Sequence, residues 1–164
     1  MSPTDVFTTM LRAVDTLDWD TVRSSFADRI EMDYTQLWGG QAQTLPIDDL
    51  VSDWTDLATG FDATQHITGP IVVTHENADR IECTTTFRAY HHVIEDVGAS
   101  TWLVAGRYDI RLRATAGRWR IQAMTLHLAY EEGDRRLVGL ARQRSATGVG
   151  GRVSRTEEST SWGR

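Results

Sequence analysis

The sequence predicts an α+β domain in which a curved, antiparallel or mixed sheet wraps around N-terminal helices to form a cone. Apolar residues recur at helical spacing over residues 6–17 and 47–58, whereas residues 63–131 alternate between apolar and polar side chains. Helices followed by long strands joined by short turns are typical of a sheet that packs one face against a helical layer. The mouth of such a cone is a natural place for a pocket.

Length and composition indicate one globular unit with a tail. The 164 residues, 40% of them hydrophobic, suffice for a single core, which we assign to residues 1–135, followed by a short helix and flexible tail in 136–164. The net charge of −6 argues against nucleic-acid binding, and no apolar run reaches the roughly 20 residues that a membrane span needs. We therefore expect a cytoplasmic protein that binds a small molecule and neither nucleic acid nor membrane.

Several common classes of site have no counterpart in the sequence. The single cysteine, Cys83, excludes an internal disulfide and a cysteine-rich metal site, and its position in a strand pattern favours a buried hydrophobic role. The sequence contains no P-loop, dinucleotide fingerprint or nucleophile-elbow serine. The aspartates of residues 48–56 indicate a solvated helix face, because no histidine accompanies them at ligand spacing. We expect no metal and no organic cofactor.

The first helix is expected to begin at Ser2-Pro3-Thr4-Asp5. This segment combines a capping serine, a proline in the first turn and an acid near the positive end of the helix dipole. Its apolar stripe consists of Val6, Phe7, Met10, Leu11, Val14 and Leu17. Asp15 lies four residues after Leu11 and so extends one edge of this stripe, which is an unusual place for a carboxylate. It can belong to a buried site, or it can simply cap the following turn.

A second, short helix with Asp18 as its cap is expected to lead into a strand over residues 29–34. Alternation in this strand gives one face to apolar side chains and Tyr34. The Tyr34 hydroxyl would then enter the interior and require a partner there, although a buried tyrosine can also be purely structural.

Residues 35–44 read as a loop, and the helix of residues 47–58 follows. The loop carries Trp38 and the pair Gly39-Gly40, so it can act as a lid over a site or as an ordinary connector. The helix presents an apolar stripe that includes Trp54 and keeps its aspartates on the opposite face.

The second half of the chain is expected to form four long strands. The first contains His66 and is interrupted by Gly69-Pro70, which suggests a bulge or an edge position. In the second, over residues 80–93, alternation places His91 on the inward face together with Phe87. A lone buried histidine can be purely structural, and a bulge would reverse this placement.

The third strand, over residues 101–113, places Tyr108 on its core face. Gly106 beside it leaves space for a ligand or for a sharp bend of the sheet. The last strand, over residues 118–129, changes its apolar face near the middle, so that the orientation of His127 stays open. Either a bulge resets the register, or the outer face packs against another subunit; we favour a homo-oligomer, a dimer or trimer.

Three motifs lie where the pocket would open: Asp33-Tyr34 at a strand end, Thr64-Gln65-His66 at the start of the sheet region, and Arg88-Ala89-Tyr90-His91 in a later strand. Together with the Gly-Arg-Trp-Arg-Ile pattern of residues 117–121, they resemble the nuclear transport factor 2-like, or SnoaL-like, family over roughly residues 5–131. Within this family the motifs are most similar to those of scytalone dehydratases. The resemblance implies a cystatin-like α+β barrel.

The resemblance also implies roles for four side chains. Asp15 and His66 would form an acid–base pair, similar to the pair in hexachlorocyclohexane dehydrochlorinases. Tyr34 and His91 would bind and protonate the leaving or carbonyl oxygen. This assignment agrees with elementary chemistry, because a neutral histidine is a competent base near pH 7 and an aspartate on its other ring nitrogen stabilises the imidazolium that forms.

Two departures from the family pattern leave the substrate open. Val14 stands where the family has a second tyrosine, and Gly106 and Tyr108 stand where it has a serine and an asparagine. Tyr108 can supply a missing hydroxyl from another side of the pocket. The candidate substrate-binding residues are Tyr108, Trp38, Trp54, Phe87, Trp102 and His127.

The sequence therefore predicts a cofactor-independent lyase, most simply a dehydratase of a hydroxylated cyclic or polyketide-like carbonyl compound, as found in secondary metabolism. The same Asp15–His66 pair can also serve an isomerase or an aldol-type polyketide cyclase. A third alternative is a non-catalytic module of this fold for small-molecule binding or assembly.

Overall fold

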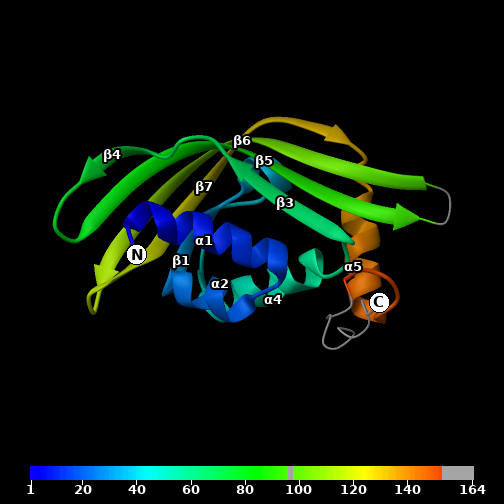
Figure 1. The fold of residues 1–164 in the computed structure, drawn as a ribbon, viewed down its shortest axis with the longest axis horizontal. Helices are drawn as coiled ribbons and strands as arrows, with labels where there is room; N and C mark the ends of the chain where they lie inside the picture. The colour runs from blue at the N-terminus through cyan, green and yellow to red at the C-terminus, as the bar shows by residue number, and fades with distance from the viewer. Residues whose placement is uncertain (96–97, 153–164) are drawn as a thin grey trace, which may run out of the picture.

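Three helices form a layer beneath a curved sheet in the computed structural model of this chain, which describes residues 1–95 and 98–152 (Figure 1). These helices are α1 (Pro3–Thr16), α2 (Trp19–Ser25) and α4 (Ile47–Ala58). The short helix α3 (Thr35–Trp38) follows the first strand, and α5 (Leu137–Thr147) packs against α4 near the C-terminal end of the described chain. No helix in the described ranges has the length and apolar character needed to span a membrane.

In the described part of the chain, seven strands make one mixed sheet whose order is β2-β1-β7-β6-β5-β3, with β4 also paired to β5. They are β1 (Phe26–Asp33), β2 (Gln43–Pro46), β3 (Ala63–Thr68), β4 (Val72–Glu76), β5 (Arg80–Glu95), β6 (Gly98–Thr115) and β7 (Arg118–Gly133). The pair β1–β7 is parallel and the other pairs are antiparallel. The described strands do not close into a barrel, because β2 and β3 lie at opposite ends of the sheet. The predicted α+β class, with a curved mixed sheet around N-terminal helices, is confirmed.

Helix α1 begins where the sequence predicts and presents its apolar stripe to the sheet. The hydroxyl of Ser2 accepts a hydrogen bond from the Asp5 amide at 3.2 Å, and the Asp5 carboxylate accepts one from the Ser2 amide at 3.1 Å. The stripe is buried from Val6 to Val14, and the Phe7 ring meets the Tyr108 ring edge-on with 5.7 Å between centroids. The helix therefore spans the underside of the sheet.

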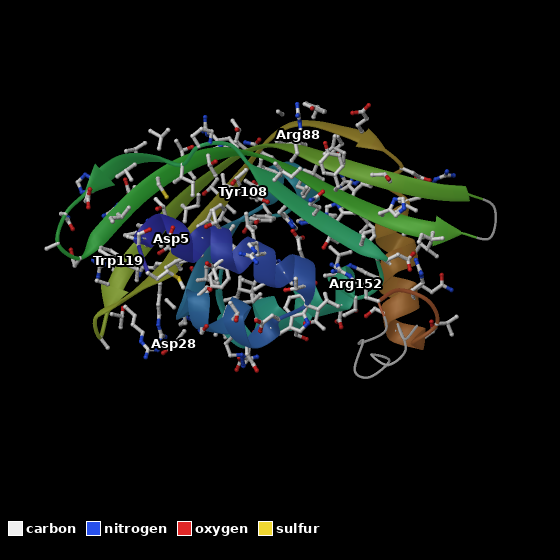
Figure 2. All side chains as sticks on the ribbon, in the orientation of Figure 1. Asp5, Asp28, Arg88, Tyr108, Trp119 and Arg152 are labelled. Carbon is white, nitrogen blue, oxygen red and sulfur yellow. The ribbon has the colours of Figure 1, made fainter. Side chains whose placement is uncertain are left out.

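Alternation along β5 and β6 divides the sheet into a core face and an outer face, as predicted. The buried core-facing residues are Ile81, Cys83, Thr85, Phe87, Ala89 and His91 on β5 and Trp102, Val104, Tyr108, Ile110 and Leu112 on β6. Figure 2 shows the contrast at two labelled positions, because Arg88 lies on the outside of the sheet and Tyr108 beneath it. Burial raises the pKa of the Cys83 thiol to about 11, which suits the predicted hydrophobic role.

A bulge in β7 explains the apolar residues that seemed to occupy both of its faces. Arg111 pairs with Ala123 and Leu112 with Ile121, which leaves Gln122 as an extra residue in β7. Residues on both sides of the bulge are therefore buried in the same core, namely Ile121, Met124 and Leu126. Because the bulge accounts for this pattern, the pattern no longer indicates a subunit interface.

Two local predictions need correction. The segment over residues 35–44 is not a plain loop, because it contains α3 and the beginning of β2, which pairs with β1. Gly106 does not open space for a ligand: a Cβ atom there would lie 2.1 Å from the backbone oxygen of His127. The glycine is needed because β7 approaches β6 closely at a register shift between Ala105 and Gly106.

The chain remains attached to the domain beyond the point where the sequence suggests a free tail. Helix α5 extends to Thr147, and its residues Leu137 and Ala141 are buried. Arg152 then donates its amide proton to the backbone oxygen of Thr59 at 3.0 Å. The described chain up to Arg152 is therefore in contact with the domain, and residues 153–164, where the rest of the expected tail falls, lie outside the described residues.

Candidate active site

A largely apolar cavity of about 100 Å³ lies between the helices and the sheet. Five of the predicted substrate-binding residues line it: Trp38, Trp54, Phe87, Trp102 and Tyr108. Its polar lining residues include Tyr34, Thr64, His66 and His91. A few polar groups converging in an apolar cavity are typical of a small-molecule site.

A wider hollow of about 400 Å³ shares part of its lining with this cavity. The shared residues are Tyr34, Trp38, Asp53 and Trp54. Gln41 and Gln43, in the segment before α4, also line this hollow, and both are exposed. The hollow therefore opens to solvent, and we identify it as the mouth of the cavity.

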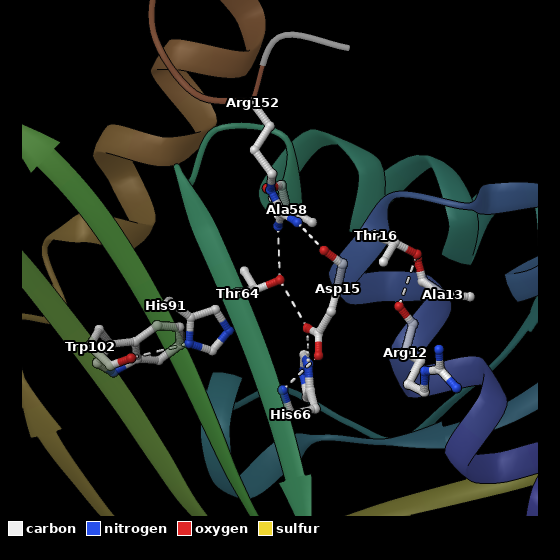
Figure 3. A network of polar contacts seen from close by, with 10 residues as sticks. All are labelled: Arg12, Ala13, Asp15, Thr16, Ala58, Thr64, His66, His91, Trp102 and Arg152. Carbon is white, nitrogen blue, oxygen red and sulfur yellow. Dashed lines mark hydrogen bonds and ion pairs between the residues drawn. The ribbon is translucent and has the colours of Figure 1, made fainter. Parts of the chain in front are cut away.

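The predicted contact between Asp15 and His66 is present at one wall of the cavity (Figure 3). Asp15 lies in the last turn of α1, and His66 lies in β3, which runs beside that helix. One carboxylate oxygen is 2.7 Å from Nδ1 of His66, and the other accepts the backbone amide of His66, also at 2.7 Å. The Thr64 hydroxyl donates to the first oxygen at 3.0 Å. Three donors therefore hold one carboxylate whose side chain is only 16% exposed.

These hydrogen bonds determine which nitrogen of His66 can act as a base. Burial alone would raise the pKa of Asp15, but hydrogen bonds from His66 and Thr64 and the charge of the imidazolium outweigh burial and lower it. An ionised Asp15 only accepts, so Nδ1 of His66 must carry a proton and Nε2 of the neutral ring must carry the lone pair. Nε2 has no hydrogen-bond partner among the described residues, and the ring lines the cavity.

His91 is positioned as predicted, and its surroundings define its protonation state. Its ring lies between Phe61 and Trp102, with centroid distances of 5.0 and 4.6 Å, and its Nδ1 lies 3.2 Å from the backbone oxygen of Trp102. Burial, followed by the charge on nearby His66, lowers the pKa of His91 to about 3. His91 is thus neutral near pH 7, with Nδ1 as donor and Nε2 as acceptor, which does not suit the proton-donating role that the family resemblance implies.

The low pKa of His91 predicts a specific loss of stability in acid. The unfolded chain takes up a proton at this histidine near its ordinary pKa of 6.5, whereas the folded chain does so only near 3. Because the unfolded state binds more protons between these values, His91 should lower the free energy of unfolding by about 1.4 kcal/mol per pH unit as pH falls through this window. His91→Gln should remove this contribution, which urea denaturation at pH 6.5, 5.5 and 4.5 can measure. His75→Gln, at an exposed position of β4, is the matched control, and equal slopes for wild type and His91→Gln would contradict the prediction.

Tyr34 and Tyr108 provide hydroxyl groups at the same cavity. Their rings stack with 6.3 Å between centroids, and Tyr108 also stacks on Phe87 at 3.9 Å. Burial raises the pKa of both hydroxyls, and for Tyr34 the neighbouring Tyr108 adds to the rise. Both tyrosines therefore stay protonated. Because the Tyr34 hydroxyl donates to the Tyr108 hydroxyl, the proton of Tyr108 is the one free to be donated to an oxygen that gains negative charge.

Trp38 lines both the cavity and its mouth and is held there by β7 and the residues after it. Its ring is 43% exposed and lies 5.8 Å from the ring of Trp102. The guanidinium of Arg135 lies 5.3 Å from the centre of the Trp38 ring and donates to the backbone oxygen of Leu37 at 2.5 Å. Glu131 accepts from Arg135 and, at 2.9 Å, from the indole nitrogen of Trp102. These contacts favour the lid interpretation of this segment.

Two predicted site residues, Asp15 and His127, are not among the residues that line the cavity; Asp15 lies behind His66, with which it is in contact. His127 lies on the outer face, where its Nε2 is 2.7 Å from Asp109, because the β7 bulge reverses the orientation of the residues after it. Asp53 lines both the cavity and its mouth although it was not a predicted site residue; its side chain is 60% exposed, as predicted for the solvated helix face, and pairs with Arg142 at 3.0 Å. Its position four residues before Leu57, at the edge of the apolar stripe, was the available signal. The described residues contain no group of three potential metal ligands.

Comparisons with known proteins agree with this architecture. Residues 4–125 match the sequence profile of the SnoaL-like domain. The Kfla4162 protein of Kribbella flavida has 27% sequence identity and a TM-score of 0.74, and the match covers 85% of this chain and 94% of that one. A candidate scytalone dehydratase of Novosphingobium aromaticivorans has 14% identity and a TM-score of 0.69, with 80% and 85% covered. The hexachlorocyclohexane dehydrochlorinase LinA-type3 of Novosphingobium barchaimii has 16% identity and a TM-score of 0.62, with 80% and 87% covered. A search of curated protein sequences gives no match.

Proposed function

The chain belongs to the SnoaL-like domain family, and on this premise we propose that it is a cofactor-independent acid–base lyase that dehydrates a hydroxylated carbonyl compound. The observation that carries the proposal is the contact between Asp15 and Nδ1 of His66, which leaves Nε2 as a free base at the cavity. A histidine held in this way can remove a proton from carbon when an adjacent carbonyl makes that proton acidic.

In the proposed reaction, Nε2 of His66 takes the proton from the carbon between the carbonyl and the hydroxylated carbon. The ionised Asp15 stabilises the imidazolium, while the neutral hydroxyl of Tyr108 donates a hydrogen bond to the enolate oxygen and is itself supported by a hydrogen bond from Tyr34. As the enolate collapses, the bond from carbon to the β-hydroxyl breaks, and the imidazolium returns its proton to the departing oxygen to form water. One histidine thus serves both proton transfers, and the substrate is neither oxidised nor reduced.

Neutral His91 then has a different role from the one that the family resemblance implies. Its Nδ1 proton faces the Trp102 carbonyl, so Nε2 can accept a hydrogen bond from the substrate hydroxyl and orient it. This acceptor role requires no charge on a ring whose pKa lies at about 3.

The cavity also limits the class of substrate. Its aromatic walls suit a planar or partly unsaturated ring, and its polar groups suit a carbonyl and a hydroxyl. The names of two structural neighbours, a dehydratase and a dehydrochlorinase, refer to eliminations of water and of hydrogen chloride. We therefore propose a cyclic or polyketide-like β-hydroxy ketone as substrate.

A panel of cyclic and fused-ring β-hydroxy ketones in D₂O tests this function. Dehydration should produce an unsaturated ketone, visible by its ultraviolet absorbance, and any deuterium in the recovered substrate should lie only on the carbon next to the carbonyl, where reversible proton removal exchanges it. A product with a moved double bond or a new ring would favour the isomerase or cyclase alternative for the same pair. Ligand-induced stabilisation without turnover of any compound would favour the binding module.

A further inference from the structure

The side chain of Arg152 joins three elements behind the Asp15–His66 pair (Figure 3). Its Nη1 donates to the backbone oxygen of Asp15 at the end of α1, and its Nη2 donates to the backbone oxygen of Ala58 at the end of α4, at 3.1 Å. The same Nη2 donates to the hydroxyl of Thr64 in β3 at 2.8 Å. Arg152 does not line the cavity, so its contacts support the pair from the side away from the substrate.

The side chain of Arg152 is held in a partly buried position that is unfavourable for a charged group. Burial lowers the pKa of its guanidinium, against the opposing charges of Asp15 and Asp62, and its Nε is buried without a hydrogen-bond partner. Two of its acceptors are backbone oxygens at helix C-termini, where the helix dipole favours a cation. Gly151 before it has φ +77°, and a Cβ atom there would lie 2.3 Å from the Thr59 oxygen. The backbone is therefore shaped to bring Arg152 to this point.

The hydrogen bonds from Arg152 to His66 form a chain with one possible direction. Thr64 accepts from Arg152, so its only hydroxyl proton is free to donate to Asp15, at 3.0 Å. Asp15 then accepts from both Thr64 and Nδ1 of His66. An arginine cannot accept a hydrogen bond, so the direction at the start of the chain is determined by its chemistry.

We propose that Arg152 is a positioning residue for the Asp15–His66 pair: by orienting the Thr64 hydroxyl and the backbone of Asp15, it keeps the proton of His66 on Nδ1 and the lone pair on Nε2. The inference rests on the proposed role of this pair in catalysis. Its main readout, however, is the state of His66 in the resting protein, which can be measured without a substrate.

The test is ¹⁵N and ¹H NMR of the His66 ring in Arg152→Met, together with hydrogen exchange of the His66 backbone amide. The wild-type ring should show a hydrogen-bonded Nδ1 proton, and Arg152→Met should lose this signal or show mixed tautomers, with faster exchange of the amide that Asp15 accepts. Arg152→Lys, which keeps the charge and a donor, should partly restore both signals. Turnover of a substrate found by the panel should fall in kcat by roughly 10- to 100-fold with little change in KM, as expected for misplacement of a base.

Two further variants separate positioning from general stability. Thr64→Val removes only the hydroxyl that links Arg152 to Asp15 and should shift the His66 tautomer, whereas Thr64→Ser should retain it. Arg118→Met, at an exposed position in the β6–β7 hairpin, is the matched control for loss of an arginine. If Arg152→Met folds and its His66 ring still shows the Nδ1 proton unchanged, the proposal is overturned. If Arg152→Met does not fold, an unchanged Nδ1 proton signal in Thr64→Val overturns it instead. Loss of the signal with normal turnover would instead overturn the proposed function of the pair.

Discussion

His66→Gln and Asp15→Asn should each lower kcat for the β-hydroxy ketone by roughly 10³-fold, because general acid–base catalysis contributes about 10²–10⁴-fold. His66→Gln removes the base itself. Asp15→Asn leaves an amide that can donate to Nδ1, so that the ring can carry its proton on Nε2, the atom that must accept the substrate proton. The measurement is steady-state kinetics of both variants, with ligand affinity followed separately by calorimetry.

Ligand affinity should change little in these variants, since most of the cavity wall is apolar and both substitutions preserve volume. His92→Gln is the matched control: His92 follows His91 in β5 but is hydrogen-bonded to Thr101 at 3.0 Å and does not line the cavity. Full turnover by both His66→Gln and Asp15→Asn would contradict the proposed base.

Gly106→Ala should destabilise the fold by at least about 2 kcal/mol, because overpacking in a tightly fitted region usually costs about 1–3 kcal/mol and here the clash is with backbone. The added methyl carbon would lie 2.1 Å from the backbone oxygen of His127, so β6 and β7 would have to separate at their register shift. Urea denaturation gives the difference in free energy of unfolding.

Gly139→Ala in α5 is the control for the same chemical change. Nothing lies within 4 Å of the added atom there, and alanine is favoured over glycine in a helix by up to about 1 kcal/mol, so this variant should be slightly more stable than wild type. Equal stabilities of Gly106→Ala and wild type would show that β7 can move away without cost.

Residue periodicity predicts that Asp15 and His91 face the interior, whereas the pairing of Asp15 with His66 is what the family resemblance implies. Asp15 extends the edge of a buried stripe, and His91 alternates in phase with Phe87 on β5. Both arguments succeed because α1 and β5 are regular over their whole lengths. The same parity argument left His127 undecided, because one extra residue in β7 reverses the orientation of everything after it and leaves no clear mark in the sequence.

Arg152 and the protonation state of His91 could not be predicted in this way. Arg152 lies 137 residues from Asp15 and binds its backbone oxygen. Because every residue has a backbone oxygen, no pattern of side chains in the sequence predicts this contact. Periodicity predicts that His91 is inside, but its charge depends on how completely Phe61 and Trp102 enclose it and on the nearby ring of His66. Such properties arise only when distant segments come together.

The two oxygens of Asp15 divide their bonds between the ring and the backbone of the same residue, His66. Rotation of the imidazole away from the carboxylate would break the ring hydrogen bond to a carboxylate that the backbone of β3 also holds in place. The ring therefore loses its rotational freedom when the chain folds. The corresponding entropy loss does not recur in each catalytic cycle. In the proposed reaction, the junction between α1 and β3 would therefore act as a preorganising element, and substitutions that loosen it should slow the chemical step even when every reacting group is still present.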